Sequence, residues 1–182
     1  MKFSWVPVVS FLAFCTLTIG MLRNYNGPAD GSPENMPAIY DRVIWQDPEL
    51  AWDPAKFTPD VVCINLGTND FSTSGVNQEK FAANYIAFAK MLIGRYPSAR
   101  LVLLMGPMLN SEALKSTLAE VVESVNKESP EKVSLFELSA QGAHGFGADG
   151  HPSQDQAKIN GTELTKYLSN LMNWPVESGP KQ

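Results

Sequence analysis

The stretch from Val61 to Asp70 constrains the fold of this chain more than any other. Val61–Leu66 is a short apolar run with β-branched residues, and Gly67 ends it. This pattern is typical of a strand buried on both faces of a parallel sheet. The polar residues Thr68–Asp70 then fall at the carboxyl end of the strand, where open α/β sheets bind their ligands. A side-chain amide such as Asn69 is a suitable oxyanion donor there, although turns also favour Asn and Asp.

The chain that follows alternates between helical and strand patterns. The stretch 77–95 carries apolar residues at helical spacing, which gives the predicted helix one apolar face. These residues are Phe81, Tyr85, Phe88 and Leu92. The other predicted elements are a short helix in 36–45, strands at 100–105 and 132–138, and a helix at 111–127. The order strand, helix, strand, helix, strand predicts an α/β domain with a parallel sheet covered by helices.

A glycine-rich loop at 142–153 carries the second chemical signal. Ser153 and Gln156 have the spacing of a capping box, so a helix begins just after His151 and holds that histidine on a short, rigid lead-in. A histidine in this position can serve as a general base. Asp149 is a candidate to orient its imidazole. The alternative is an Asp-Gly turn with an incidental histidine, and the chain's other histidine, His144, has only the features of a loop residue.

Composition excludes several classes of function. With 182 residues, 44% of them hydrophobic and 18% charged, the chain is long enough for one domain with a proper core. A net charge of −5 without a basic run argues against a nucleic-acid partner. Cys15 and Cys63 form no disulfide framework, and we expect Cys63 to be a small buried apolar residue. The sequence shows neither a metal-ligand cluster nor a phosphate loop, so we expect no metal or cofactor and give little weight to a nucleotide-binding domain.

The start of the chain resembles a targeting segment. Residues 3–19 are almost entirely apolar or small, and Lys2 is the only charge before Arg23. This pattern favours a secretory signal peptide and a secreted protein, with no stable membrane partner. A signal anchor and a buried strand of the domain are the alternatives. The predicted organisation is an apolar segment at 1–19, one domain at 20–175 and a polar tail at 176–182, and we expect a monomer.

Three ordered blocks together resemble the SGNH (GDSL-type) hydrolases, and most of all the catalytic domain of the second carbohydrate esterase family. The blocks are Gly20–Gly27, Val61–Ser72 and Gly147–Ser153. The resemblance implies a flavodoxin-like three-layer αβα sandwich. It also implies that the Gly20 backbone N–H and the Asn69 side chain stabilise an oxyanion, that His151 is the general base and that Asp149 orients it.

The chain departs from this family in two ways. Many SGNH enzymes carry the acid three residues before the histidine, where this chain has Ala148; in some of the resembled esterases a backbone carbonyl orients the histidine instead. The second departure is that no Gly-Asp-Ser block occurs in these residues, and only Ser4 and Ser10 precede Gly20. The nucleophile is therefore unknown, and we expect the first strand of the sheet to be missing or replaced. The β-sandwich that precedes the family's esterase domain is not found in this sequence either.

The resemblance implies removal of acetyl groups from acetylated polysaccharide such as xylan, by acyl transfer to a serine. Its partner would be the acetylated carbohydrate substrate. Because the serine block is absent, the alternative is a catalytically inactive fragment or a saccharide-binding relic of such an esterase.

Overall fold

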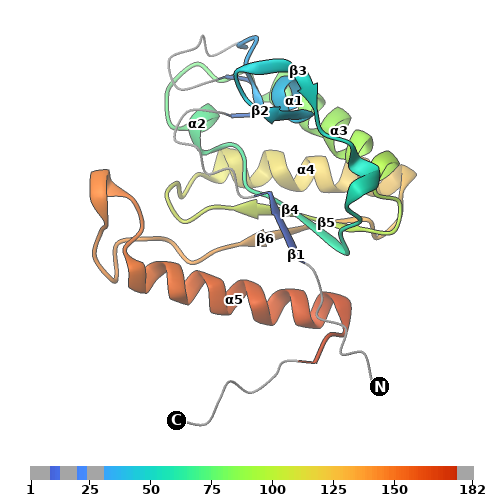
Figure 1. Ribbon diagram of the computed structural model, residues 1–182. Coiled ribbons are helices and arrows are strands. Elements are labelled where there is room, and N and C mark those ends of the chain that lie inside the picture. Colours follow the sequence, from blue (N-terminus) through green and yellow to red (C-terminus); the bar gives the residue numbers. More distant parts are fainter. Residues whose placement is uncertain (1–8, 13–19, 24–30, 176–182) are drawn as a thin grey trace.

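The structure, a computed structural model, describes residues 9–12, 20–23 and 31–175. A four-stranded sheet forms the middle layer, and helices lie on both of its faces (Figure 1). Predictions that concern Ser4, Cys15, the second half of the first block and the tail 176–182 fall outside the described residues.

The sheet has the strand order β1-β4-β5-β6, and every neighbouring pair is parallel. Its strands are β1 (Val9–Leu12), β4 (Val61–Ile64), β5 (Arg100–Met105) and β6 (Val133–Glu137). Parallel pairing requires a long crossover between strands, and the helices along the chain supply it. The predicted parallel sheet and its three strands at 61–66, 100–105 and 132–138 are confirmed, with ends that differ by up to two residues.

Alternate residues of β4 enter two different cores. Val62 and Ile64 pack with residues of α3 (Gln78–Arg95) and α4 (Glu112–Glu128), whereas Val61 and Cys63 pack with residues of α5 (Gln154–Met172). Since successive side chains of a strand point to opposite faces, α3 and α4 cover one face of the sheet and α5 covers the other. This arrangement confirms the predicted three-layer αβα sandwich.

Cys63 has the buried role predicted for it. Its side chain is 1% exposed and lies in the core between the sheet and α5. Burial raises the pKa of its thiol to about 11, because a thiolate is poorly solvated among apolar side chains. Cys63 is therefore a small core residue and not a reactive thiol.

Each long helix begins at a side-chain cap and buries an apolar face, which in α3 is the face predicted from the sequence. Asn77, Ser111 and Ser153 accept hydrogen bonds from the backbone N–H three residues later, which satisfies a donor that has no partner within the helix. The buried apolar positions are Phe81, Tyr85, Phe88 and Leu92 in α3, Leu114, Leu118, Val121 and Val125 in α4, and Leu164 and Leu168 in α5.

The short helix predicted for 36–45 is wrong beyond its first turn. Helix α1 spans only Met36–Ile39, and the chain continues as an antiparallel hairpin of β2 (Arg42–Ile44) and β3 (Asp47–Ala51), followed by the 3₁₀-helix η1 (Pro54–Lys56). All five residues of β3 are exposed. A strand with no buried face lacks the alternation of apolar and polar residues from which strands are predicted.

Val9–Leu12 pairs in parallel with β4 and so forms the edge strand β1. This backbone pairing corresponds to the alternative in which the apolar start supplies a strand of the domain. The rest of the predicted targeting segment lies outside the described residues. Within the part of the chain that the structure describes, no helix is both long and apolar enough to cross a bilayer.

An ion pair fastens the segment after α1 to the end of α3. The Arg95 guanidinium donates through Nη1 and Nη2 to the two carboxylate oxygens of Asp41, with Nη2 2.6 Å from Oδ2, and it lies over the Tyr40 ring at 5.4 Å. A bidentate pair of this kind fixes orientation as well as distance. It therefore sets where the β2–β3 hairpin leaves the core.

Removing this pair is expected to lower stability in a pH-dependent way. Arg95 holds the pKa of Asp41 below its usual value, so the stabilisation is present above the unfolded-state pKa of about 3.9 and is lost as the pH falls through the lower folded-state pKa. Because the Asp41 side chain is half exposed, Asp41→Asn should cost about 0.5–1 kcal/mol at pH 7. Urea unfolding across pH measures this, and equal free energies of unfolding at pH 7 would contradict it.

Candidate active site

Two segments that carry polar candidates lie at the same edge of the sheet. Helix α2 (Thr68–Phe71) follows β4, and the loop that contains the 3₁₀-helix η2 (Ala148–Gly150) follows β6. Because β4 and β6 run in the same direction, both segments leave the sheet at its carboxyl edge, as Figure 1 shows. The fold therefore brings Asn69 and His151 to one edge, where open α/β sheets place their sites.

Gly67 makes the sharp connection from β4 to α2. Its backbone has φ 122°, and a Cβ added there would lie 2.5 Å from Cδ1 of Leu114. Both the conformation and the lack of space favour glycine. The chain can thus turn directly from the buried strand into α2, where the partly exposed Asn69 lies with its backbone C=O accepting from the Ser72 hydroxyl at 3.2 Å.

Asp70, the residue after Asn69, binds the segment 20–23. Its side chain is 1% exposed, its Oδ2 accepts the Met21 N–H at 2.9 Å and its Oδ1 accepts the Leu22 N–H at 2.8 Å. Burial raises the pKa of Asp70, and hydrogen bonds from the backbone of Leu22, Met21 and Arg23 act against that rise. The sequence pattern around Asp70 does not indicate this role.

Gly20 lies directly against this carboxylate. A Cβ at Gly20 would come within 2.4 Å of Asp70 Oδ2, so no other residue fits without displacing one of the two. The Gly20 N–H donates to the Arg23 C=O at 2.6 Å, and its C=O accepts from the Met36 N–H at 2.9 Å. An oxyanion role for this N–H therefore requires it to exchange the Arg23 carbonyl for the substrate oxygen.

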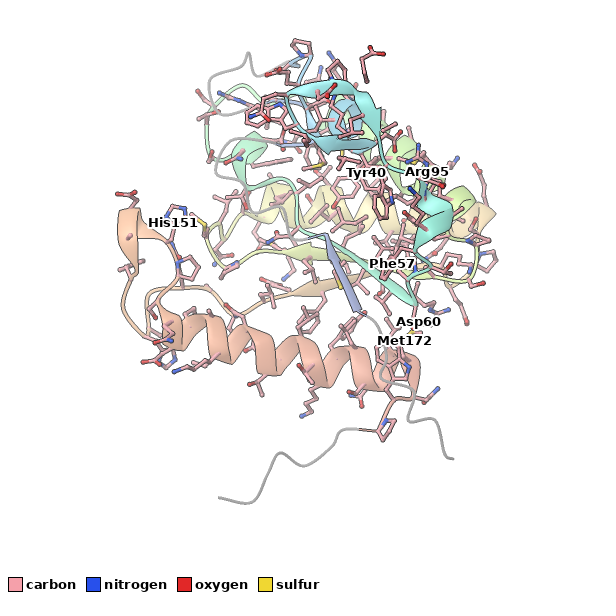
Figure 2. The ribbon with its side chains drawn as sticks, in the orientation of Figure 1. Tyr40, Phe57, Asp60, Arg95, His151 and Met172 are labelled. Atoms are coloured by element: carbon pink, nitrogen blue, oxygen red, sulfur yellow. The ribbon has the colours of Figure 1, made fainter. Side chains whose placement is uncertain are left out.

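The imidazole of His151 is held by a backbone carbonyl. Nδ1 lies 2.9 Å from the Ala148 O, and the backbone N–H of His151 donates to that same carbonyl at 3.0 Å. A carbonyl oxygen only accepts, so Nδ1 carries the proton in the neutral ring and Nε2 has a free lone pair. Nε2 is buried and has no hydrogen-bond partner among the described residues. This is the tautomer that a general base requires. Figure 2 shows the His151 side chain beside η2.

Asp149, the predicted candidate to orient the imidazole, makes no hydrogen bond with His151 in the described structure. It is exposed and has a left-handed backbone, with φ 50° and ψ 35°. The resulting turn brings the carbonyl of Ala148, rather than the carboxylate of Asp149, to Nδ1.

The loop around His151 is fixed by hydrogen bonds that the sequence analysis did not anticipate. The Gln141 N–H donates to the Pro107 C=O at 3.0 Å, and its Nε2 donates to the Gly150 C=O at 2.9 Å. The Ser153 hydroxyl donates to the His144 C=O at 2.8 Å. Gln141 thus ties the His151 loop to the end of β5, whereas the exposed His144 contributes only its backbone, as a loop residue would.

No hydroxyl or thiol of the described residues forms a hydrogen bond with His151 Nε2. Ser10 belongs to β1, of which only the backbone is described, and Ser4 lies outside the described residues. In the same part of the chain, no group of three or more His, Cys, Asp or Glu side chains is arranged to hold a metal ion. The chemistry that this edge offers is proton transfer at His151 Nε2, together with hydrogen-bond donation by an amide at Asn69.

Comparison with solved structures gives neighbours of the same fold. A family two carbohydrate esterase from Clostridium thermocellum, solved in complex with cellohexaose, superimposes with a TM-score of 0.79 at 32% identity, over 87% of this chain and 49% of that one. An acetyl xylan esterase from Butyrivibrio proteoclasticus gives a TM-score of 0.75 at 22% identity, over 87% of this chain and 50% of that one, and this shows the fold alone.

Sequence comparison gives relatives with related names. The cellulase/esterase CelE of Acetivibrio thermocellus is 37% identical over 162 residues, which are 86% of this chain and 19% of that protein. An acetylxylan esterase / glucomannan deacetylase of Cellvibrio japonicus is 29% identical over 159 residues, which are 85% of this chain and 42% of that protein. The chain thus spans less than half the length of either relative. Residues 24–161 match the family described as GDSL-like lipase/acylhydrolase, and the chain therefore belongs to that family.

Proposed function

We propose that this chain is an esterase that removes acetyl groups from polysaccharide, and that its described residues supply the acid–base and oxyanion-binding groups. The observation that carries the proposal is His151, whose Nδ1 is held at 2.9 Å by the Ala148 C=O while its buried Nε2 has no partner among the described residues. Membership of the GDSL-like lipase/acylhydrolase family supports acyl transfer as the reaction. The relative named acetylxylan esterase / glucomannan deacetylase supports an acetylated polysaccharide such as xylan as the substrate.

In this mechanism a serine hydroxyl attacks the acetyl carbonyl while His151 Nε2 accepts its proton. The carbonyl oxygen becomes an oxyanion, which the Asn69 amide and the Gly20 N–H stabilise by donating hydrogen bonds. His151 then returns the proton to the departing sugar oxygen, and water hydrolyses the acetyl-enzyme by the same steps. The Ala148 carbonyl orients the imidazole and interacts favourably with its charged form.

Two measurements on the purified chain test this proposal. Acetate release from acetylated xylan measures the reaction, and intact mass after treatment with a fluorophosphonate detects an activated serine. A single adduct that His151→Ala abolishes, together with acetate release, supports the proposal, and peptide mapping then names the nucleophile. Folded protein that forms no adduct and releases no acetate overturns it for this chain.

A second candidate function is a saccharide-binding relic, which the absence of a Gly-Asp-Ser block favours. This candidate is expected to bind oligosaccharides without turnover. Calorimetric titration with xylo-oligosaccharides and cellohexaose distinguishes the two, because binding without acetate release supports the relic and no binding rejects it.

Three further properties stay part of the proposal. Two relatives are named cellulase/esterase and acetylxylan esterase / glucomannan deacetylase. Names of this kind support a secreted protein, which the apolar start of the chain also favours. We also propose a monomer without nucleic-acid or membrane partners, and a single domain at 20–175 whose sheet is extended by the edge strand β1. Size-exclusion chromatography with light scattering tests the monomer.

The geometry at His151 predicts that Asp149 is dispensable for the reaction. The carboxylate makes no hydrogen bond with the imidazole, and asparagine adopts the left-handed backbone that Asp149 has. Removing the acid of a triad costs about 10⁴-fold in rate, whereas Asp149→Asn should cost less than about tenfold. The turnover rate for acetate release measures this, and a loss approaching that of a triad acid would restore Asp149 to the orienting role.

A further inference from the structure

Asp70 is a buried carboxylate that the proposed reaction does not use. Among the described residues it is the one Asp, Glu, Lys, Arg or His whose side chain is buried, with 1% of it exposed. Burying a carboxylate costs free energy unless hydrogen bonds replace the lost water. Here the replacement comes from backbone N–H groups of a segment about fifty residues earlier in the chain.

The two oxygens of Asp70 hold consecutive N–H groups of one turn. Oδ2 accepts from Met21 and Oδ1 accepts from Leu22, at 2.9 and 2.8 Å. Two charge-assisted bonds to adjacent groups fix the orientation of the turn as well as its distance. The carboxylate also lies against Gly20, where even a methyl group would come within 2.4 Å of it. The position of Gly20 is thus set by Asp70.

The same residue belongs to the short helix that carries Asn69. Helix α2 is also anchored in the core by Phe71, whose ring packs edge-on against the Phe81 ring at a centroid distance of 5.0 Å. A change at Asp70 is therefore passed to the turn at Gly20–Arg23 and to Asn69 alike. Asp70 connects the two segments that carry the proposed oxyanion donors.

We propose that Asp70 is a positioning residue for the oxyanion site, whose buried carboxylate keeps the Gly20 turn and the Asn69 side chain in register with each other. This inference rests on the proposed function in one respect: Gly20 and Asn69 are taken as the hydrogen-bond donors to the oxyanion. Asp70 itself touches no reacting atom in this scheme. Its effect on the reaction is exerted through the two donors.

The matched substitutions are Asp70→Asn and Asp60→Asn. Asparagine has nearly the shape of aspartate but replaces one acceptor oxygen by an NH₂ group, which cannot accept from Met21 or Leu22. Asp60 is exposed and immediately precedes β4, so it lies at the opposite end of that strand from α2 (Figure 2). We expect Asp70→Asn to lower kcat for acetate release by about 10- to 100-fold with little change in KM, as a displaced catalytic group does. Asp60→Asn should change neither.

A second readout does not depend on activity. In the ¹⁵N-labelled protein, Asp70→Asn should shift the amide signals of Gly20, Met21 and Leu22 and the side-chain NH₂ signals of Asn69. Signals from α5 should stay in place, which distinguishes local repositioning from a general loss of structure. If Asp70→Asn does not fold, Gly20→Ala is the second variant, because its methyl group pushes the 20–23 turn away from the Asp70 carboxylate. It should also shift the Asn69 signals.

The outcomes separate the two proposals. If the unmodified chain releases no acetate, the proposed function fails, and the Asn69 signals alone decide the role of Asp70. The inference is supported if the Asn69 signals shift and if all shifted signals belong to the 20–23 turn or to α2. Unchanged Asn69 signals, or a kcat for Asp70→Asn equal to that of Asp60→Asn in an active protein, overturn it.

Discussion

Replacing His151 by alanine is expected to lower the rate of acetate release by about 10²- to 10⁴-fold, the range that general acid–base catalysis contributes. Without the imidazole, the reaction loses the group assigned to take the proton of the attacking hydroxyl. KM should change little, because the ring acts on the proton in the transition state and not on the bound sugar. Steady-state kinetics on acetylated xylo-oligosaccharides measure both quantities.

His144→Ala is the matched control for this substitution. The His144 side chain is exposed, and its backbone C=O, which alanine keeps, accepts from the Ser153 hydroxyl. We therefore expect activity close to that of the unmodified protein. If His144→Ala and His151→Ala reduced the rate equally, the loop as a whole and not the imidazole of His151 would be responsible, and the assigned general base would be wrong.

Gly67→Ala is expected to cause the largest loss of stability, about 2–5 kcal/mol in the free energy of unfolding. Two effects add at this position. The backbone φ of 122° strains any residue with a side chain, and the new methyl group would lie 2.5 Å from Leu114 Cδ1 and 3.3 Å from Phe81 Cζ. The total free energy of unfolding of a typical domain is only about 5–15 kcal/mol. Urea unfolding at pH 7 measures the loss.

Gly161→Ala provides the opposite control. Gly161 lies in α5, and a Cβ added to it meets nothing within 4 Å. Alanine is a better helix former than glycine, so this variant should be more stable by about 0.5–1 kcal/mol. A Gly67→Ala protein as stable as Gly161→Ala would show that the β4–α2 connection yields without strain. In that case the position of Asn69 would be less constrained than the geometry implies.

Most of the layered architecture could be predicted from the sequence, because buried positions recur at the spacing of a strand or helix and are occupied by apolar residues. Strands β4 to β6 are apolar on both faces or nearly so, and α3 and α4 each bury one stripe of side chains. The β2–β3 hairpin was missed for the complementary reason: all of β3 is exposed, so the pattern that reveals a strand is absent. Periodicity predicts elements that pack against a core, because their buried positions must be apolar. It does not predict elements that are exposed on all sides, because their positions carry no such requirement.

For the site, the order of the amino acids was enough to identify Asn69 after β4 and His151 after β6 as candidates, because both occur in blocks that resemble a known family. How these two residues are held could be seen only in the folded chain. Asp70 finds its partners 49 and 48 residues away, and the group at Nδ1 of His151 is the backbone carbonyl of Ala148. A backbone carbonyl is present in every residue and a long-range hydrogen bond has no local spacing, so neither leaves a mark in the order of the amino acids.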